Sequence, residues 1–188
     1  MSYYQDNPVE DRLLFAEHRM NDLRSLNNGD LGGATPRERQ QLIQEFFFHL
    51  VGAIDFLAQE VNMARGLGLN AEDVSPSKVR QALADTDPIQ ELIAQLHPYT
   101  RQKPLPSNPY SEEGSHFRIM LLRNFVSHIK NNPFLFYATV EPPTPASLIL
   151  DPRLDPNNRQ PSKYLVFDEM TIFHDLVTAK CQRALKAL

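Results

Sequence analysis

At four points in this 188-residue chain, a short polar residue followed directly by proline precedes a run of apolar residues at helical spacing. The pairs are Asn7-Pro8, Thr35-Pro36, Ser75-Pro76 and Asp87-Pro88. Asn, Thr, Ser and Asp side chains can accept hydrogen bonds from the free N–H groups at a helix start, and proline suits the first helical position. The sequence therefore predicts four helices that begin at these points.

Apolar residues recur every three or four positions after each start, which indicates amphipathic helices. The first run stops at Asn27-Asn28-Gly29, and the second, the longest, extends to about Gly66 or Gly68. A fifth helix is expected to begin between Ser111 and Ser115 and to end before Pro133, because the residue before proline disfavours the helical conformation. A sixth is expected from Asp168, as its cap, towards Leu188. The pattern predicts a mainly α fold with a single domain over residues 1–188.

Two short apolar runs, residues 147–150 and 164–167, flank a polar segment that contains three prolines. Apolar runs of this length between turn-forming residues are typical of strands. We therefore expect a small β-hairpin insertion at about 147–167, before the last helix.

The charge and the cysteine count limit the function classes. A net charge of −4 excludes a general coat for polyanions, so any nucleic acid must be bound locally. The single cysteine, Cys181, forms neither an intrachain disulfide nor a Cys-rich zinc site, which fits a reducing compartment. The first residues lack a signal-peptide pattern, and no segment approaches roughly 18 uninterrupted apolar residues. We expect a cytoplasmic protein without a membrane span.

Metal and nucleotide-cofactor motifs are missing from the sequence. His116, His128 and His174 have no metal-ligand spacing, and the glycines at 29, 32 and 33 lie between two expected helices, not after a strand. No cofactor and no metal are therefore expected.

The segment Arg123-Asn124-Phe125-Val126-Ser127-His128 carries the strongest chemical signal. At about 100° per residue, Asn124 and His128 lie one helical turn apart and can touch. Arg123 lies about 140° from His128, so its long side chain must reach round the helix to share a site with it. Pairing across a partner subunit would remove that geometrical difficulty.

Arg-Asn-x-x-x-His within an apolar helix of a helical domain resembles the Arg-x4-6-His signature of the HEPN superfamily, in which Asn often follows the arginine. The order of long helix, motif helix, hairpin and final helix is also similar to some bacterial members, over about residues 36–188. The resemblance implies a bundle of about five to six helices that forms a homodimer. It also implies a metal-independent endoribonuclease, acting as a toxin or defence effector with a possible protein antitoxin.

The resemblance also implies roles for individual residues. Arg123 would bind the scissile phosphate and stabilise its developing charge, and His128 would act as general acid or base. Asn124 would orient His128 or contact the phosphate. Ser127 and Lys130 would contact RNA, and the product would be a 2′,3′-cyclic phosphate.

Two other hypotheses stay open. The first is a non-catalytic HEPN-like module that binds a nucleotide, an RNA or a protein through the same cleft, and the second is a helical scaffold with an accidental motif. Glu45, His49 and Asp55 on the long helix are further candidates to line the cleft, and no spacing rule selects one of them. We expect His49 to be partly buried against a neighbour, and Phe46, Phe47 and Phe48 to pack in the core or an interface.

Overall fold

The computed structural model describes residues 7–28, 36–98, 106–128 and 162–188. Their helices are α1 (Pro8–Asn28), α2 (Pro36–Arg65), α3 (Pro76–Ala82), α4 (Pro88–Leu96), α5 (Glu112–His128) and α6 (Val166–Lys186), with a 3-10 turn, η1, at Ala71–Asp73. No strand occurs among these residues. The predicted mainly α class is therefore confirmed for the part of the chain that the structure describes.

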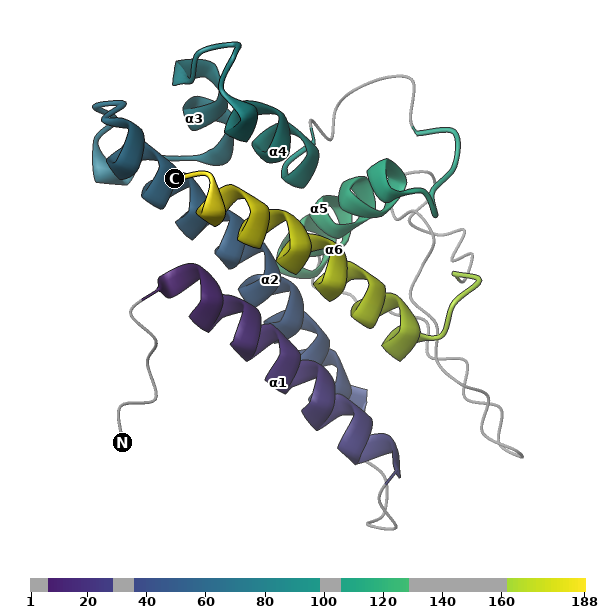
Figure 1. The fold of residues 1–188 in the computed structure, drawn as a ribbon. Coiled ribbons are helices and arrows are strands. Elements are labelled where there is room, and N and C mark those ends of the chain that lie inside the picture. Colours follow the sequence, from purple (N-terminus) through teal and green to yellow (C-terminus); the bar gives the residue numbers. More distant parts are fainter. Residues whose placement is uncertain (1–6, 29–35, 99–105, 129–161) are drawn as a thin grey trace.

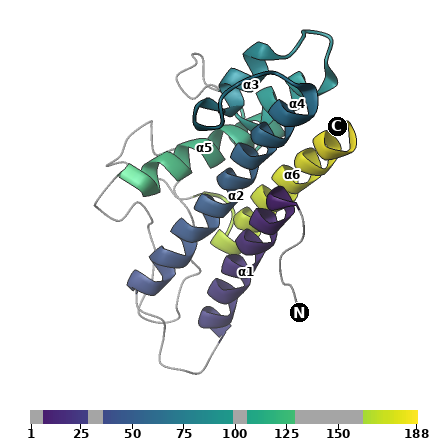
Figure 2. The same cartoon turned by 90° about the vertical axis from the view of Figure 1, so that its left-hand side faces the viewer.

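Three long helices form the body of the molecule (Figure 1). Helices α1, α2 and α6 pack side by side, and α1 runs antiparallel to the other two. Helices α3 and α4 cover the end at which α2 and α6 finish, and α5 crosses α2, as the second view also shows (Figure 2). Helix α2 therefore contacts every other helix and forms the centre of the fold.

The predicted caps are confirmed at three of the four helix starts. The backbone N–H of Val9 donates to Asn7 Oδ1 at 3.0 Å, and that of Ile89 donates to Asp87 Oδ1 at 2.9 Å. The N–H of Lys78 donates to Ser75 Oγ at 3.4 Å. Thr35, the fourth cap, lies outside the described residues. These bonds satisfy N–H groups that a helix cannot pair internally.

The apolar stripes read from the sequence form one continuous core. Helix α2 contributes its largest share, and the side chains of Phe46 and Phe47 are fully buried. Residues Arg37–Arg65 are long and apolar enough to cross a membrane by length and composition alone, and half of the tested window is buried inside the described fold. Burial of this kind is also what the central helix of a helical bundle requires.

The chain around the expected hairpin differs from the prediction. Residues 147–150, its first strand, lie outside the described residues. The second expected strand, residues 164–167, is wrong at its end, because Val166 and Phe167 belong to α6. That helix begins at Val166, with Leu165 at the cap position, so Asp168 lies in its first turn and does not cap it. The earlier start brings the fully buried side chains of Val166 and Glu169 towards the core.

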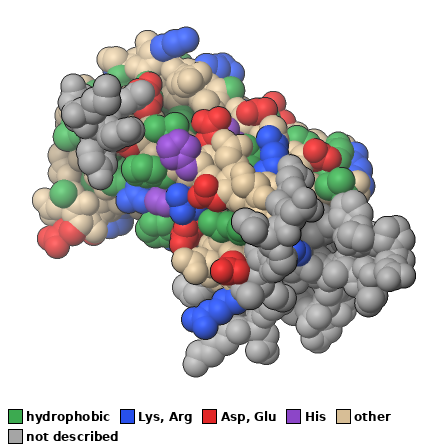
Figure 3. All heavy atoms as spheres, turned by 90° about the horizontal axis from the view of Figure 1, so that it is seen from below, with side chains coloured by type: hydrophobic (Ala, Val, Ile, Leu, Met, Phe, Trp, Pro, Cys, Tyr) green, Lys and Arg blue, Asp and Glu red, His purple; other side chains and the backbone are tan. Residues whose placement is uncertain are grey.

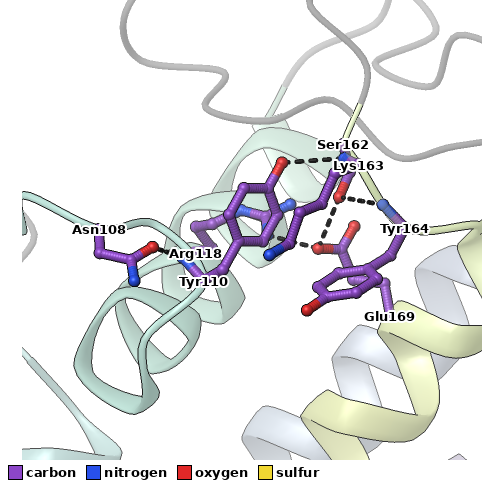
Figure 4. A network of polar contacts seen from close by, with 7 residues as sticks. All are labelled: Asn108, Tyr110, Arg118, Ser162, Lys163, Tyr164 and Glu169. Atoms are coloured by element: carbon purple, nitrogen blue, oxygen red, sulfur yellow. Dashed lines mark hydrogen bonds and ion pairs between the residues drawn. The ribbon is translucent and has the colours of Figure 1, made fainter.

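A buried ion pair fixes α5 against α6 (Figure 4). Arg118 Nη1 donates to Glu169 Oε1, and the two side chains are 2% and 1% exposed. Ser162 Oγ donates to the same carboxylate oxygen at 3.0 Å. Burial raises the pKa of Glu169, while the Arg118 charge and the hydrogen bonds from Arg118 and Ser162 oppose that rise. The pair therefore couples the helix that carries the sequence motif to the C-terminal helix.

Tyr110 extends this contact towards the segment before α6 (Figure 4). Its ring lies between two cations, with the Arg118 guanidinium carbon 5.3 Å and the Lys163 ammonium 4.2 Å from the ring centroid. Its hydroxyl oxygen accepts the backbone N–H of Lys163 at 2.9 Å, and its ring meets that of Tyr164 edge to face at 5.3 Å. The loop before α5 and the residues before α6 are thus held together.

Candidate functional site

Arg123 and Asn124 lie at the point where α5 leaves the core. Residues 114–122 of this helix are all buried, whereas both motif residues are half-buried. Arg123 Nη1 donates to Asn124 Oδ1 at 3.1 Å, so the amide contacts the guanidinium directly. The described structure therefore brings together two of the three predicted catalytic residues, directly after the buried part of α5.

Asp55 of α2 and His97, the residue after α4, lie within electrostatic range of Arg123. Burial raises the pKa of the Asp55 carboxyl, and the nearby His97 and Arg123 act in the opposite direction. Burial lowers the pKa of His97, and Asp55 opposes this shift, while Arg80 and Arg123 add to it. Imidazole in this position is therefore neutral near pH 7.

The arrangement combines three kinds of group from three helical segments. Arg123 offers a cation for a phosphate or carboxylate, Asp55 an acidic group within electrostatic range of it, and His97 a neutral ring with one hydrogen-bond donor and one acceptor. The His97 backbone N–H donates to Ile93 O at 2.9 Å, which fixes the end of α4. Groups of these kinds have the chemistry to bind an anion and to transfer a proton.

His128 and Ser127 belong to α5 as its last residues, and their side chains lie outside the described part of the structure. Lys130 also falls outside it. The predicted pairing of Arg123 with His128, and the predicted RNA contacts of Ser127 and Lys130, therefore stay predictions.

The structure separates the three candidates on the long helix. Glu45 accepts a hydrogen bond from Arg19 Nη1 at 3.3 Å, and His49 Nδ1 lies 3.0 Å from Arg12 Nη1. Since arginine can only donate, His49 Nδ1 is the acceptor and its ring is neutral, which agrees with a pKa lowered by burial and by the two arginines. Glu45 and His49 thus face α1, and Asp55 alone of the three is electrostatically linked to Arg123.

The expectation for the three phenylalanines is confirmed in part. Phe46 and Phe47 are core residues, as expected, whereas the side chain of Phe48 is 60% exposed. The Arg12 guanidinium carbon lies 5.3 Å from the centroids of both the Phe48 and Phe56 rings. Phe48 therefore belongs to the surface of α2, where it is available to an interface.

Charges of both signs are mixed at the surface. Figure 3 shows acidic, basic and histidine side chains lying next to one another on one face, with hydrophobic surface around them and no broad basic patch among the atoms coloured there. This agrees with the net charge, and any polyanion on that face would depend on a few local groups.

His97 was not predicted from the sequence, because no spacing rule connects it to Arg123. Asp55 was predicted only as one of three candidates on the long helix, and spacing could not separate it from Glu45 and His49. Within the described residues, no group of three or more His, Cys, Asp or Glu side chains is placed to hold a metal ion. No protein-family model, curated protein or solved structure matches the chain.

Proposed function

We propose that this chain is a HEPN-like, homodimeric, metal-independent endoribonuclease whose catalytic residues are Arg123, Asn124 and His128. The observation that supports the proposal is the position of Arg123, which is half-buried directly after the buried part of α5, with its guanidinium bonded to Asn124. A guanidinium held by a neighbouring amide loses less conformational freedom when it binds a phosphate.

The proposed reaction needs one charge stabiliser and one proton carrier. His128 takes the proton from a ribose 2′-hydroxyl, the 2′-oxygen attacks phosphorus, and the bond to the 5′-oxygen breaks. The leaving oxygen takes a proton, and the products are a 2′,3′-cyclic phosphate and a 5′-hydroxyl. Arg123 donates two N–H groups to the phosphate oxygens, where charge accumulates in the transition state.

The exposed face of α2 supports a dimer. Phe48 and Met63 are 60% and 66% exposed, and Asp55 lies between them on the same face at helical spacing. Large apolar side chains exposed along one helix are typical of an interface with another chain. A second copy that packs on this face would also lie next to Asp55, and thus next to Arg123.

A second candidate function is a non-catalytic module that binds a nucleotide, an RNA or a protein. The position of Asp55 favours it, because a carboxyl group within range of Arg123 competes with a phosphate for the guanidinium. In that case the site would bind RNA and leave it intact.

A subunit-mixing experiment tests whether the proposed site is shared between two copies. Arg123→Ala and His128→Ala proteins are prepared separately, mixed in equal amounts and allowed to exchange subunits. If each site takes Arg123 from one copy and His128 from the other, half of the dimers regain one of two sites, which is about a quarter of the wild-type activity. Activity that stays absent after verified exchange contradicts a shared site.

The dimer itself is tested by the mass of the protein in solution, measured by light scattering. Phe48→Glu and Met63→Glu place charges on the exposed face of α2 and should give a monomer. Leu188→Glu is the matched control, because Leu188 is another exposed apolar residue and lies at the chain end. A monomeric wild-type protein would contradict the proposal.

A further inference from the structure

A second site is formed by a pocket of about 600 Å³ between α3, α4 and α5. Its lining residues are Arg80, Glu91, Ala94, Gln95, Pro98, Glu112, Glu113 and His116. The volume lies within the range of roughly 300–1,000 Å³ that small-molecule sites occupy. Neither Arg123 nor Asp55 lines the pocket, so the inference does not depend on the proposed ribonuclease function.

His116 is the least expected member of this wall. Its side chain is 1% exposed, and neither ring nitrogen has a hydrogen-bond partner. Burial, assisted by the Lys180 charge, lowers the pKa of His116 to about 4, and Glu112 opposes this only in part. The ring is therefore neutral near pH 7, with one N–H donor and one nitrogen acceptor unused. Buried polar groups without partners destabilise a fold, so a retained one points to a ligand.

The polar groups around His116 are held in place by one another. The Lys180 ammonium, in a side chain 4% exposed, contacts Gln95 Oε1 and Glu112 Oε1. Gln95 in turn donates from Nε2 to Glu91 Oε1 at 2.7 Å. Helices α4, α5 and α6 are thus connected through the pocket wall. A site built in this way needs little rearrangement to bind a ligand.

The charge of the lining selects a cation. Three glutamates and one arginine line the pocket, and the glutamates still outnumber the cations when the buried Lys180, which contacts Glu112, is included. Ala94 and Pro98 add apolar surface that methylene groups can contact. An aliphatic amine matches both features, because its ammonium groups pair with carboxylates while its carbon chain covers the apolar part.

We propose that this pocket binds a small aliphatic polyamine, with its ammonium groups at Glu91 and Glu113 and one amine N–H donated to His116. Glu112 and Glu113 are exposed and form the outer wall. Glu112 stays on the Lys180 ammonium, and a change of rotamer at Glu113 alone opens the way to the imidazole. Arg80 also lines the pocket, and its positive charge repels the ammonium groups, which therefore bind at the glutamates.

Titration calorimetry of the full-length chain at pH 7 and low salt tests the proposal with three probes. Spermidine carries the proposed charge, while 1,4-butanediol and succinate offer a similar carbon chain that is neutral or anionic. We expect saturable one-to-one binding of spermidine and no binding of the other two. Equal binding of succinate, or no saturable heat with spermidine, overturns the proposal.

Variants then locate the binding. Glu91→Gln combined with Glu113→Gln should weaken spermidine binding at least about tenfold, since two charge contacts are lost. Glu72→Gln, at an exposed site on η1, is the matched control and should bind as the wild type does. An affinity that is the same in all of these proteins contradicts the site.

His116→Phe separates a ligand contact from a structural role. Phenylalanine fills the same space without unpaired nitrogens, so the variant should unfold at a higher temperature than the wild type and bind spermidine more weakly. A variant that is more stable and binds with unchanged affinity removes His116 from the site and overturns its role in the proposal.

Discussion

The buried pair of Arg118 and Glu169 should make stability depend on pH once the arginine is removed. In Arg118→Met the apolar stem is kept, but the Glu169 carboxylate loses its counter-charge in a site that is 1% exposed. Removing one partner of a buried ion pair costs about 3–5 kcal/mol, a large part of the roughly 5–15 kcal/mol that stabilises an ordinary domain.

The direction of the pH dependence follows from the raised pKa of Glu169. Burial already raises this pKa in the wild type, and removal of Arg118 takes away the charge that opposes the rise. A carboxyl whose pKa is higher in the folded state binds more protons there, so folding is favoured at low pH and stability falls as the pH rises. The extra loss in Arg118→Met should grow by up to about 1.4 kcal/mol per pH unit until its raised pKa is passed.

Urea unfolding followed by circular dichroism at pH 5, 6, 7 and 8 measures the effect. We expect a smaller loss at pH 5 than at pH 8, because the raised pKa of Glu169 favours its neutral form in the folded state at the lower pH. In a Glu169→Gln background, which has no carboxyl to titrate, the same Arg118→Met change should cost an amount that does not vary with pH. A loss equal at pH 5 and 8, or below about 1 kcal/mol at pH 8, would show that Arg118 does not hold the Glu169 carboxylate in its charged form.

Three other predictions test the fold around the two sites. Gly114→Ala should destabilise by about 1–3 kcal/mol in thermal unfolding despite the better helix propensity of alanine, because a Cβ would lie 2.2 Å from Asn108 O; an unchanged Tm would contradict the close approach. Cys181, whose pKa is raised to about 12 by burial, should react with a thiol reagent only as the protein unfolds, and rapid labelling in the native state would show otherwise. The pKa of His116 is lowered from 6.5 to about 4 in the folded protein, so the unfolded chain binds the proton first as the pH falls. The free energy of unfolding should therefore decrease by about 3 kcal/mol from pH 6.5 to pH 4. His116→Phe should lose this part of the pH dependence.

The features of the fold that depend only on residues close together in the sequence could be predicted. Asn7, Ser75 and Asp87 cap their helices as expected, because a cap needs only the backbone two or three residues further on. The buried face of α2 could be predicted in the same way, because the spacing of its apolar residues depends on this helix alone. The predicted cap of α6, Asp168, lies three residues after the observed cap position, Leu165, and the earlier start includes the buried Val166, which no local capping signal indicates.

The contacts between distant residues could not be predicted. Arg118 falls in the apolar arc of its helix, which suggests a buried partner, but nothing in the sequence selects Glu169, 51 residues away. His116 looked like any helical histidine until the structure placed it in a pocket wall. The link of Arg123 to Asp55 and His97 likewise depends on how α2, α4 and α5 pack.

Cleavage of RNA under chelation is the measurement that tests the proposed function most directly. The wild type, Arg123→Ala and His128→Ala are incubated with mixed cellular RNA in EDTA, with Arg183→Ala and His18→Ala as controls that make the same changes at exposed positions outside the motif. We expect cleavage by the wild type and both controls, 2′,3′-cyclic phosphate ends, and no cleavage by the two motif variants. Cleavage that persists in Arg123→Ala and His128→Ala, or wild-type protein that binds RNA and leaves it intact, would contradict it.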